Sequence, residues 1–288
     1  MKPPLFDYHD PSTVDRALDL LAEHGEDAKV LAGGQSLVPL LNFRLASPDY
    51  LIDLSRIPSL AYIRRCDGVL RIGTMTRQAT LEASPLVAGH WPLLLGAIGY
   101  VAHAQIRNRG TVGGSVAHAD PAAELPVAFT VLDATFHLRT RQRTRSVGWR
   151  DFFITHLTTA IEPDELLVEI EVPPVPPGTG WAFTEYARRH GDFALGGAAA
   201  LITIEDGACR RARLGLLAAD YTPVRAEAAE RALEGTQITV EAIAEAARIA
   251  VADITPTGDI HGSSEYRKQL IEGMVRRAIE QARERAGR

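Results

Sequence analysis

The sequence is poor in cysteine and has no excess of positive charge. Its 288 residues include only two cysteines, Cys66 and Cys209, so this chain alone can build neither a disulfide framework nor a four-cysteine zinc or iron–sulfur site. Lysine and arginine total 31 against 36 aspartate and glutamate, which argues against a nucleic-acid partner because phosphate binding needs a basic surface. If the protein handles electrons, a bound organic cofactor must carry them.

Long apolar runs are also missing. The apolar stretch at residues 93–104 is interrupted by glycine and histidine, well short of the roughly 18 residues that a membrane span needs. The N-terminus lacks the apolar core of a signal peptide, because Asp7 and His9 come too early. With 46% hydrophobic and 23% charged residues, the composition is that of a globular protein of one large or two smaller domains, which we expect to be cytoplasmic.

The beginning of the chain predicts a small α/β lobe. Residues 14–24 have the apolar spacing of an amphipathic helix, with Ser12 as its N-cap. A short apolar strand at residues 29–32 runs into a pair of glycines, and a second strand occupies residues 50–54. The alternation of helix, strand, glycine turn and strand is typical of an α/β unit.

The next part of the chain predicts a mixture of strands and helices. Asp67-Gly68 is a turn signal for a hairpin within residues 60–74. Apolar runs beyond it are interpreted as buried strands, and two amphipathic stretches as helices. The predicted helices lie at 76–83 and 92–104, and the predicted strands at 125–132, 136–138 and 166–172.

A proline-rich segment at residues 173–178 is the clearest boundary in the sequence. Its four prolines cannot continue a strand or a helix interior, so we expect a domain seam here. Beyond it, apolar runs at 194–205 and 209–218 flank Asp206-Gly207 and predict a long hairpin. Three helical patterns close the chain, at residues 225–233, 240–251 and 265–283.

Two glycine-rich segments are the most informative features. Residues 32–37 follow a predicted strand, and residues 110–115 follow a predicted helix and a basic loop. Paired glycines let the backbone approach a ligand and turn successive N–H groups inward, which forms a nest for phosphate. Ser36, Thr111 and Ser115 add hydroxyl donors. Together the segments favour a bound pyrophosphate, and a plain tight turn is the alternative for each.

Neither segment matches a known nucleotide-binding fingerprint. The chain contains no G-x-G-x-x-G at these places and no G-x-x-x-x-G-K-[ST], which disfavours nicotinamide binding by the usual route and nucleotide hydrolysis. Residues 34–38 begin like a nucleophile elbow, but Val38 stands where the last glycine belongs. A serine hydrolase is therefore disfavoured as well.

Four polar residues near the second glycine segment could be drawn as a metal site. They are His103, His118, Asp120 and Glu124. Their spacing matches no zinc pattern, and an imidazole beside a glycine loop is more simply a hydrogen-bonding or stacking partner for a ligand. We therefore expect no metal on this chain.

Arginines occupy alternate positions of a predicted hairpin, and their default interpretation is a solvated face. A docking surface for an acidic partner is the alternative. The arginines are Arg139, Arg141, Arg143 and Arg145. Two aromatic residues further along the chain, Trp181 and Phe193, are expected in the core by default.

Four segments, at residues 32–40, 105–115, 119–126 and 188–194, closely resemble the FAD-binding medium subunit of molybdenum hydroxylases. Carbon monoxide dehydrogenase, xanthine dehydrogenase and the nicotine, caffeine and quinoline dehydrogenases belong to this family. The likeness extends over essentially the whole chain, including residues 264–267 at the entry to the last helix. Four motifs in the same order make the resemblance highly specific.

The resemblance implies an α+β fold with a two-lobed FAD-binding domain of the vanillyl-alcohol-oxidase-like type. This domain would span residues 1–175, with lobes at about 1–56 and 57–175. A C-terminal domain of antiparallel sheet plus helices would follow at residues 178–288. The proline-rich segment, interpreted without the resemblance, places the seam in the same region.

The resemblance also implies which residues bind FAD. Two glycine-rich segments would clasp the pyrophosphate and the ribityl chain. Glu124 would lie near the ribityl or ribose hydroxyls, Leu167 would pack by the flavin, and Phe193 would lie near the isoalloxazine ring. The full set of expected FAD-binding residues is Val30, Leu31, Ala32, Gly33, Gly34, Gln35, Ser36, Leu37, Thr111, Val112, Gly113, Gly114, Ser115, His118, Glu124, Leu167 and Phe193.

Two residues depart from the family pattern. Glu185 stands where some relatives have a lysine that reaches the flavin, which removes a cation that would stabilise reduced, anionic flavin. Gln35 replaces the histidine of carbon monoxide dehydrogenases, which favours a relative that acts on a heteroaromatic substrate.

By resemblance, the protein is an electron-transfer subunit of a heterotrimeric complex. FAD would accept electrons from a small subunit with [2Fe-2S] clusters and pass them to an external acceptor, while a large subunit with the molybdopterin cofactor hydroxylates the substrate. A dimer of such heterotrimers is expected, and no residue of this chain need be a general acid or base. The alternatives are a stand-alone flavoprotein oxidoreductase and a flavin-free assembly subunit.

Overall fold

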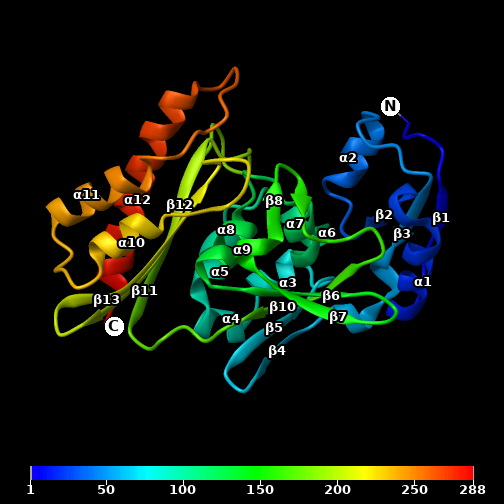
Figure 1. Ribbon diagram of the computed structural model, residues 1–288, viewed down its shortest axis with the longest axis horizontal. Coiled ribbons are helices and arrows are strands. Elements are labelled where there is room, and N and C mark those ends of the chain that lie inside the picture. Colours follow the sequence, from blue (N-terminus) through cyan, green and yellow to red (C-terminus); the bar gives the residue numbers. More distant parts are fainter. Residues whose placement is uncertain (1, 288) are drawn as a thin grey trace.

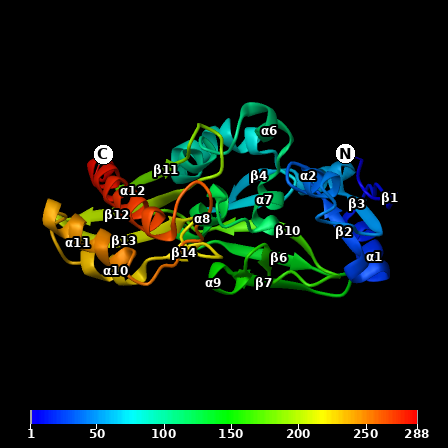
Figure 2. The same ribbon diagram turned by 90° about the horizontal axis from the view of Figure 1, so that it is seen from above.

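The computed structural model describes residues 2–287 and confirms the predicted α+β class. The molecule is elongated, and its two termini lie at opposite ends (Figures 1 and 2). A small first lobe occupies the N-terminal end, a second lobe with a five-stranded sheet lies in the middle, and a C-terminal unit of sheet and helices forms the other end. Within residues 2–287, no helix combines the length and the apolar character needed to cross a membrane.

The first lobe is a three-stranded parallel sheet in the order β1-β3-β2, covered by α1. Helix α1 buries Leu18 and Leu21 in the core of the lobe. Its N-cap is Thr13, whose side chain accepts a hydrogen bond from the Arg16 N–H, so the predicted Ser12 cap is wrong by one residue. The elements are β1 Asp7–His9, α1 Val14–His24, η1 Gly25–Asp27, β2 Ala28–Leu31, α2 Leu37–Asn42, β3 Tyr50–Asp53, η2 Leu54–Arg56 and η3 Pro58–Leu60.

The second lobe contains an antiparallel sheet in the order β4-β5-β10-β6-β7. The predicted hairpin turn is confirmed, because Asp67 and Gly68 both have positive φ (52° and 84°), as this tight turn requires. The strands are β4 Ile63–Cys66, β5 Val69–Gly73, β6 Thr135–Arg139, β7 Thr144–Gly148, β8 Phe153–Thr155, β9 Thr158–Thr159 and β10 Leu166–Val172.

Seven short helices accompany the second sheet, and one of them corrects the sequence interpretation. The run at 125–132, predicted as a strand, is helix α8, and all of its residues are buried. A segment surrounded by apolar neighbours on every side shows no periodicity that separates helix from strand. The helices are α3 Gln78–Glu82, α4 Pro85–His90, α5 Pro92–Ile98, α6 Ala104–Arg109, α7 Val112–His118, α8 Glu124–Val131 and α9 Trp149–Phe152.

The C-terminal unit is an antiparallel sheet in the order β11-β12-β13-β14, with α12 packed along one face. Glycines allow this close approach: a Cβ on Gly180 would lie 1.8 Å from the Ala282 carbonyl oxygen. Thr184 Oγ1 donates to the Met274 carbonyl oxygen (2.9 Å) on the same face. The elements are β11 Thr179–Tyr186, β12 Gly196–Glu205, β13 Ala208–Leu217, β14 Val224–Arg225, α10 Glu227–Leu233, α11 Val240–Ala250 and α12 Ser264–Arg285.

The other face of this sheet packs against the second lobe. A Cβ on Gly96 of α5 would lie 2.6 Å from the Trp181 ring, and Phe183 contacts Tyr100 with ring centroids 5.7 Å apart. Phe183 and Leu217 belong to the same buried apolar cluster as the residues of α5 and α8. The core is therefore continuous across the region where the proline-rich segment connects β10 to β11.

Candidate functional site

The first glycine segment leaves a row of backbone N–H groups without acceptors. It follows β2 directly, and Gly34 has φ +74°, a conformation that glycine adopts without strain. Within residues 2–287, the backbone N–H groups of residues 33–37 donate to no protein acceptor. The Gln35 amide instead donates to the Gly33 carbonyl oxygen (2.9 Å), which braces the turn. Consecutive free N–H groups of this kind form an anion-binding nest.

The second glycine segment is the beginning of helix α7 rather than a turn. Thr111 caps the helix by accepting the Gly114 N–H (3.1 Å). The N–H groups of Val112 and Gly113 donate to the carbonyl oxygens of Thr76 and Thr74, each at 2.9 Å. These N–H groups are thus used inside the protein, and Gly113 is glycine because a Cβ there would lie 2.3 Å from that of Thr74.

The two segments are in contact and form one continuous edge. A Cβ on Gly33 would lie 2.5 Å from the Arg109 carbonyl oxygen and 2.7 Å from the Gly110 Cα. A Cβ on Gly114 would lie 3.3 Å from that of Ala32. Segments from two lobes therefore meet at glycines, and backbone rather than side chain lines their junction.

A pair of arginines beside this junction escaped the sequence analysis. The Arg77 guanidinium donates to the Arg109 carbonyl oxygen, and a β-bridge joins Arg77 to Thr111. Burial, followed by the nearby positive charge of Arg109, lowers the pKa of Arg77. Neither arginine forms an ion pair with any residue that the structure describes. The only signal in the sequence was the basic character of the segment before Gly110.

The remaining expected FAD-binding residues differ in exposure. Ser36 is exposed, whereas Leu167 is buried in the apolar cluster of the second lobe. His118 is half-buried, and burial is the main cause that lowers its pKa, so the ring is favoured in its neutral form. The expected residues that are half-buried along the edge are Val30, Leu31, Ala32, Gly33, Gly34, Gln35, Leu37, Gly114 and Ser115.

Two carboxyl groups are largely withdrawn from water: Glu124 at the beginning of α8 is buried, and Glu185 on β11 is half-buried. Glu124 is 9% exposed, and the Oε2 atom of Glu185 is fully buried without a hydrogen-bond partner. Burial raises the pKa of Glu124 to about 7. Burial, and secondly the charge of Glu124, raises the pKa of Glu185 to about 9. Neither carboxyl group has a cationic partner within residues 2–287.

Phe193 is 74% exposed, which contradicts its default placement in the core. It lies on the loop that connects β11 to β12, together with His190, whose ring centroid is 6.3 Å from that of His103. Trp181, the other residue expected in the core, is half-buried at the margin of the apolar cluster. A large aromatic ring that the fold leaves uncovered is available to a ligand.

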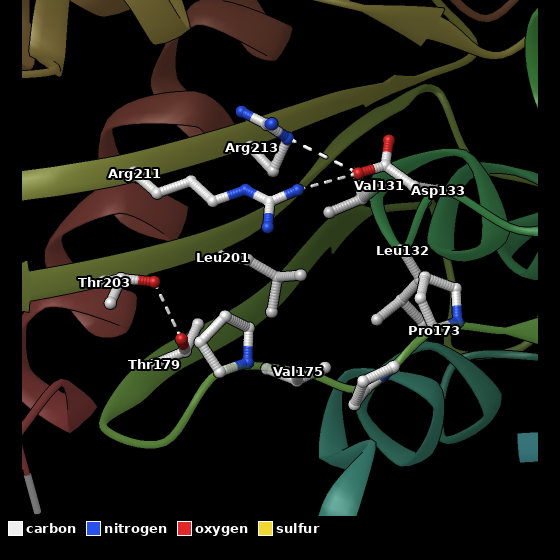
Figure 3. A pocket seen from close by; sticks show the side chains of 12 residues that line it. Val131, Leu132, Asp133, Pro173, Val175, Thr179, Leu201, Thr203, Arg211 and Arg213 are labelled. Atoms are coloured by element: carbon white, nitrogen blue, oxygen red, sulfur yellow. Dashed lines mark hydrogen bonds and ion pairs between the residues drawn. The ribbon is translucent and has the colours of Figure 1, made fainter. Parts of the chain in front are cut away.

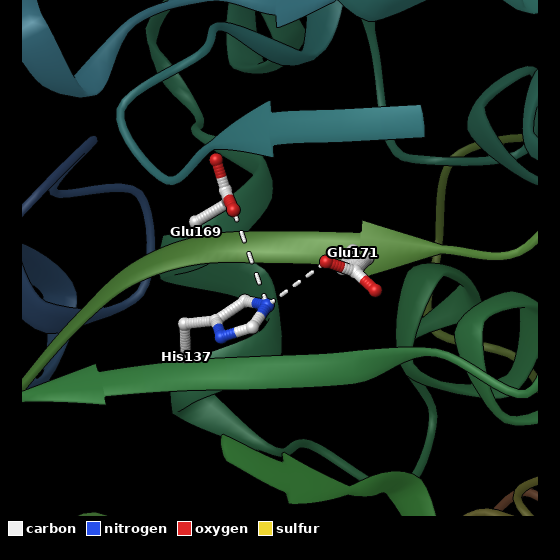
Figure 4. Close-up of side chains that lie close together, drawn as sticks. All are labelled: His137, Glu169 and Glu171. Carbon is white, nitrogen blue, oxygen red and sulfur yellow. Dashed lines mark hydrogen bonds and ion pairs between the residues drawn. The ribbon is translucent and has the colours of Figure 1, made fainter. Parts of the chain in front are cut away.

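The four residues drawn as a possible metal site do not form one. Among the described residues, the only group of three close potential ligands is His137, Glu169 and Glu171, on neighbouring strands β6 and β10 (Figure 4). Glu169 is already bound by Arg71 at 2.6 Å and by Tyr62 at 2.6 Å. Guanidinium groups thus supply the positive charge that a metal would bring, and this cluster joins the strands of the sheet.

The four arginines at alternate positions of the hairpin form ion pairs with acidic residues of the same chain. Arg139 pairs with Asp15 (2.7 Å) and Arg141 with Asp19 (2.9 Å), which ties β6 and its turn to α1 of the first lobe. The other two pair with one buried acidic residue, Arg145 at 2.6 Å and Arg143 at 3.9 Å from Glu165. The first two arginines therefore join the two lobes, and the other two join parts of the second lobe.

A groove lies beneath the proline-rich segment, away from the glycine junction (Figure 3). Leu201 and Val175 form its apolar side. On its polar side, Asp133 accepts from Arg211 (3.0 Å) and lies 3.5 Å from Arg213. These ion pairs join the turn after α8 to β13, so the groove borders the contact between the second lobe and the C-terminal unit.

Comparison with known proteins identifies the family. Residues 4–175 match the FAD binding domain in molybdopterin dehydrogenase, and residues 181–282 match the CO dehydrogenase flavoprotein C-terminal domain. The chain therefore belongs to the flavoprotein family of molybdopterin dehydrogenases. The predicted family, the FAD cofactor and the class of oxidoreductase are confirmed by this match.

Relatives match along nearly the whole chain. The chain is 47% identical over 287 residues to the 6-hydroxypseudooxynicotine dehydrogenase complex subunit alpha of Paenarthrobacter nicotinovorans, covering 99% of this chain and 97% of the relative. It is 38% identical over 282 residues to the carbon monoxide dehydrogenase medium chain of Hydrogenophaga pseudoflava, covering 98% of each. A solved structure of carbon monoxide dehydrogenase from Hydrogenophaga pseudoflava, lacking the Mo-pyranopterin moiety, matches with a TM-score of 0.98 at 40% identity over 100% of both chains.

Proposed function

We propose that this chain is the FAD-carrying electron-transfer subunit of a heterotrimeric molybdenum hydroxylase. It takes electrons from an iron–sulfur subunit with [2Fe-2S] clusters and delivers them to an external acceptor. A large subunit with the molybdopterin cofactor hydroxylates the substrate, and two heterotrimers assemble into a dimer. The two relatives described above are a subunit of a dehydrogenase complex and the medium chain of a dehydrogenase, which supports a role within a complex.

The observation that carries the proposal is the row of free N–H groups at residues 33–37 beside two unpaired arginines. An FAD pyrophosphate is a dianion, and consecutive N–H donors with nearby guanidinium groups are the partners that it needs. The glycine junction lets this group approach the backbone. The chain therefore offers a site that fits the cofactor named by its family.

Several of the expected residues then have a part in holding the cofactor. The N–H groups of Gly33 and Gly34, with Ser36, bind the pyrophosphate, and residues 111–115 support them from below. Glu124, the first residue of α8, and His118, the last residue of α7, would bind the hydroxyl-bearing part of the cofactor. Phe193 would cover the flavin ring. When bound, FAD supplies the chemistry that takes up and releases electrons.

The residues of this chain therefore bind and orient the cofactor and shield it from water, and none has to act as a catalytic residue. The substrate is proposed to be a small organic, heteroaromatic molecule. Identity to the 6-hydroxypseudooxynicotine dehydrogenase subunit (47%) exceeds identity to the carbon monoxide dehydrogenase medium chain (38%), which favours an organic substrate over carbon monoxide.

The test is purification of the native complex through a tag on this chain, followed by an absorption spectrum and identification of the flavin released on denaturation. We expect FAD, iron–sulfur absorbance and two further chains. A single chain that is colourless and does not bind added FAD would contradict the proposal. Turnover of a small substrate by this chain alone would instead establish the stand-alone flavoprotein.

Variants sharpen this experiment. Arg77→Gln should weaken FAD binding about tenfold, because one charge-assisted contact to a phosphate contributes roughly 1.5 kcal/mol. Arg231→Gln removes the same charge from a side chain that is 69% exposed on α10, and should leave FAD binding unchanged. Equal loss in both variants would show that overall charge, rather than the glycine junction, controls the affinity.

A further inference from the structure

The groove beneath the proline-rich segment has its floor on the face of the C-terminal sheet that is turned away from α12. The strand register places Thr179, Thr203 and Arg211 directly opposite one another across β11, β12 and β13. Two residues away on the same face, Leu201 of β12 lies opposite Arg213 of β13. All five residues line a cavity of about 90 Å³ (Figure 3).

Arg211 carries the least compensated positive charge on this floor. Its one acidic partner among the described residues is Asp133, at 3.0 Å, and that carboxylate also accepts from Arg225 at 2.9 Å. Arg213, by contrast, lies 3.6 Å from Glu230 as well as 3.5 Å from Asp133. Asp133 therefore divides its negative charge among three guanidinium groups, and Arg211 has no second carboxylate beside it.

Hydrogen-bond donors on this floor are also left free. The Arg211 Nη2 atom donates to Asp133, whereas its Nη1 atom donates to no acceptor within residues 2–287. Figure 3 shows a nitrogen of this guanidinium directed toward Leu201, into the groove. The Thr179 and Thr203 hydroxyls lie 2.7 Å apart, so one hydroxyl proton serves their contact and the other remains to be donated. Because Thr203 and Arg211 are paired across the strands, both donors can reach one small ligand.

The remaining walls of the groove are apolar. Leu201 lies on the floor, and Val131, Leu132, Val175 and three prolines of the segment at 173–178 line the rest. This combination suits a ligand with an apolar body and one anionic end, because the body leaves water while the guanidinium and hydroxyl donors hold the anion. A dianion such as phosphate is disfavoured, since one carboxylate already lies on the polar side of the groove.

We propose that this groove binds a small monocarboxylate with an apolar body, whose carboxylate accepts hydrogen bonds from Arg211 and from the Thr179–Thr203 hydroxyl pair. Its body contacts Leu201 and the proline-rich segment. The bound acid therefore connects the second lobe to the C-terminal unit at their seam. The groove lies apart from the glycine junction, and binding there does not require FAD. No covalent bond changes on binding.

Benzoate tests this site, and benzamide is the matched control because it has the same shape without the charge. Both are titrated calorimetrically into the native protein purified through a tag on this chain. We expect benzoate to bind with a Kd on the order of 1 mM, as befits one charge-assisted contact and one small ring. Benzamide should bind at least about tenfold more weakly, since a guanidinium donates a weaker hydrogen bond to a neutral oxygen than to a carboxylate.

Arg211→Gln removes the guanidinium and should weaken benzoate binding about tenfold. The fold should be retained, because Asp133 keeps Arg225 at 2.9 Å and the Arg211 side chain is 42% exposed. Arg210→Gln is the matched variant, since this neighbouring side chain is 71% exposed, pairs with Glu205 and does not line the groove. It should bind benzoate as the unmodified protein does.

Equal affinity for benzoate and benzamide in the unmodified protein would overturn the inference, and so would the absence of benzoate binding at concentrations up to about 20 mM. Benzoate binding that is unchanged in Arg211→Gln would place the ligand elsewhere on the protein and overturn it as well. The comparison of the two ligands needs no variant, so it decides the outcome even if Arg211→Gln fails to fold.

Discussion

Gly33 of the first lobe lies against the carbonyl group of Arg109 in the second lobe, so closely that a Cβ would come within 2.5 Å of its oxygen. The same carbonyl oxygen accepts a hydrogen bond from the Arg77 guanidinium. One backbone group therefore sets the spacing of the two lobes and holds a cation beside the free N–H groups of residues 33–37. Position 33 must be glycine because the Cβ of any other residue would collide with the Arg109 carbonyl group, and this holds whether or not a ligand is bound.

Gly33→Ala should therefore open this junction. Real Cβ atoms do not approach backbone this closely, so the first glycine segment must move away from Arg109, and its N–H groups no longer converge. We expect at least about tenfold weaker FAD binding, measured by flavin retention after gel filtration and by titration with FAD.

Gly89→Ala is the matched control for this substitution. Gly89 lies in α4, and a Cβ there meets no atom within 4 Å, so alanine should be neutral or stabilise the protein by about 0.5 kcal/mol through the helix propensity. A Gly33→Ala protein that holds FAD as tightly as the Gly89→Ala protein would show that the junction tolerates displacement.

Glu185→Gln should stabilise the chain, and more so as the pH rises. Burial and the charge of Glu124 raise the pKa of Glu185 from its usual 4.5 to about 9. Between these values the unfolded chain releases the proton and the folded chain keeps it, so stability is lost as the pH rises from about 4.5 and is constant above about 9. Glutamine removes this loss.

The expected gain in free energy of unfolding is on the order of 2 kcal/mol at pH 8 and small at pH 5, measured by urea denaturation. Glu205→Gln should differ from the unmodified protein by less than about 0.5 kcal/mol at both pH values, because its side chain is 63% exposed. A gain that does not grow with pH would mean that Glu185 is ionised in the folded protein.

Arg225 should be among the most costly arginines to remove. Its side chain is 4% exposed and donates to Asp133 (2.9 Å), to Glu230 and to the Thr130 carbonyl oxygen (2.9 Å). It thus connects α8, β14 and α10. Arg225→Ala leaves the buried Glu230 carboxylate without its closest partner, a situation that costs about 3–5 kcal/mol.

Thermal and urea unfolding of the variant, beside Arg248→Ala, would measure this cost. Arg248 pairs with Glu245 on the surface of α11, with both side chains more than half exposed, so its loss should cost less than about 0.5 kcal/mol. Similar stability of the two variants would mean that Arg213, 3.6 Å from Glu230, replaces Arg225.

Local signals were sufficient for much of the fold. Asp67-Gly68 and Asp206-Gly207 predicted both hairpins, because a tight turn needs positive φ at consecutive residues and these residue pairs tolerate it. The strand predicted at residues 125–132 was wrong because local signals are missing there. A segment that is buried on all sides has no apolar periodicity that separates a helix from a strand.

The part of the candidate site that consecutive residues form could be predicted from the sequence, whereas the part that depends on tertiary contacts could not. The glycine segment at residues 32–37 is a property of consecutive residues, so sequence alone identified it. The position of Arg77 depends on a β-bridge to Thr111, which is distant in the chain, and the burial of Glu124 depends on tertiary packing. Glu124 and Glu185 were both noted in the sequence, but no local pattern shows that neither carboxyl group has a cationic partner among the described residues.

Phe193 separates a role in binding from a role in folding. Its ring is 74% exposed and supports no core, so Phe193→Ala should change the free energy of unfolding of the flavin-free protein by less than about 0.5 kcal/mol. If the ring covers the flavin, the same change removes a stacking contact of about 1–1.5 kcal/mol and weakens FAD binding about tenfold. Flavin fluorescence should rise with solvent access to the ring.

Ile260→Ala is the control, because Ile260 is 95% exposed on the loop before α12 and has no proposed contact with FAD. It should alter neither stability nor FAD affinity. Equal, small effects of the two substitutions on FAD binding would show that Phe193 does not contact the flavin. A loss of stability in Phe193→Ala alone would mean that the β11–β12 loop packs on the protein through this ring. A loss of FAD affinity without a loss of stability is the result that a flavin-covering ring requires, since an exposed side chain can affect affinity alone only by touching what binds.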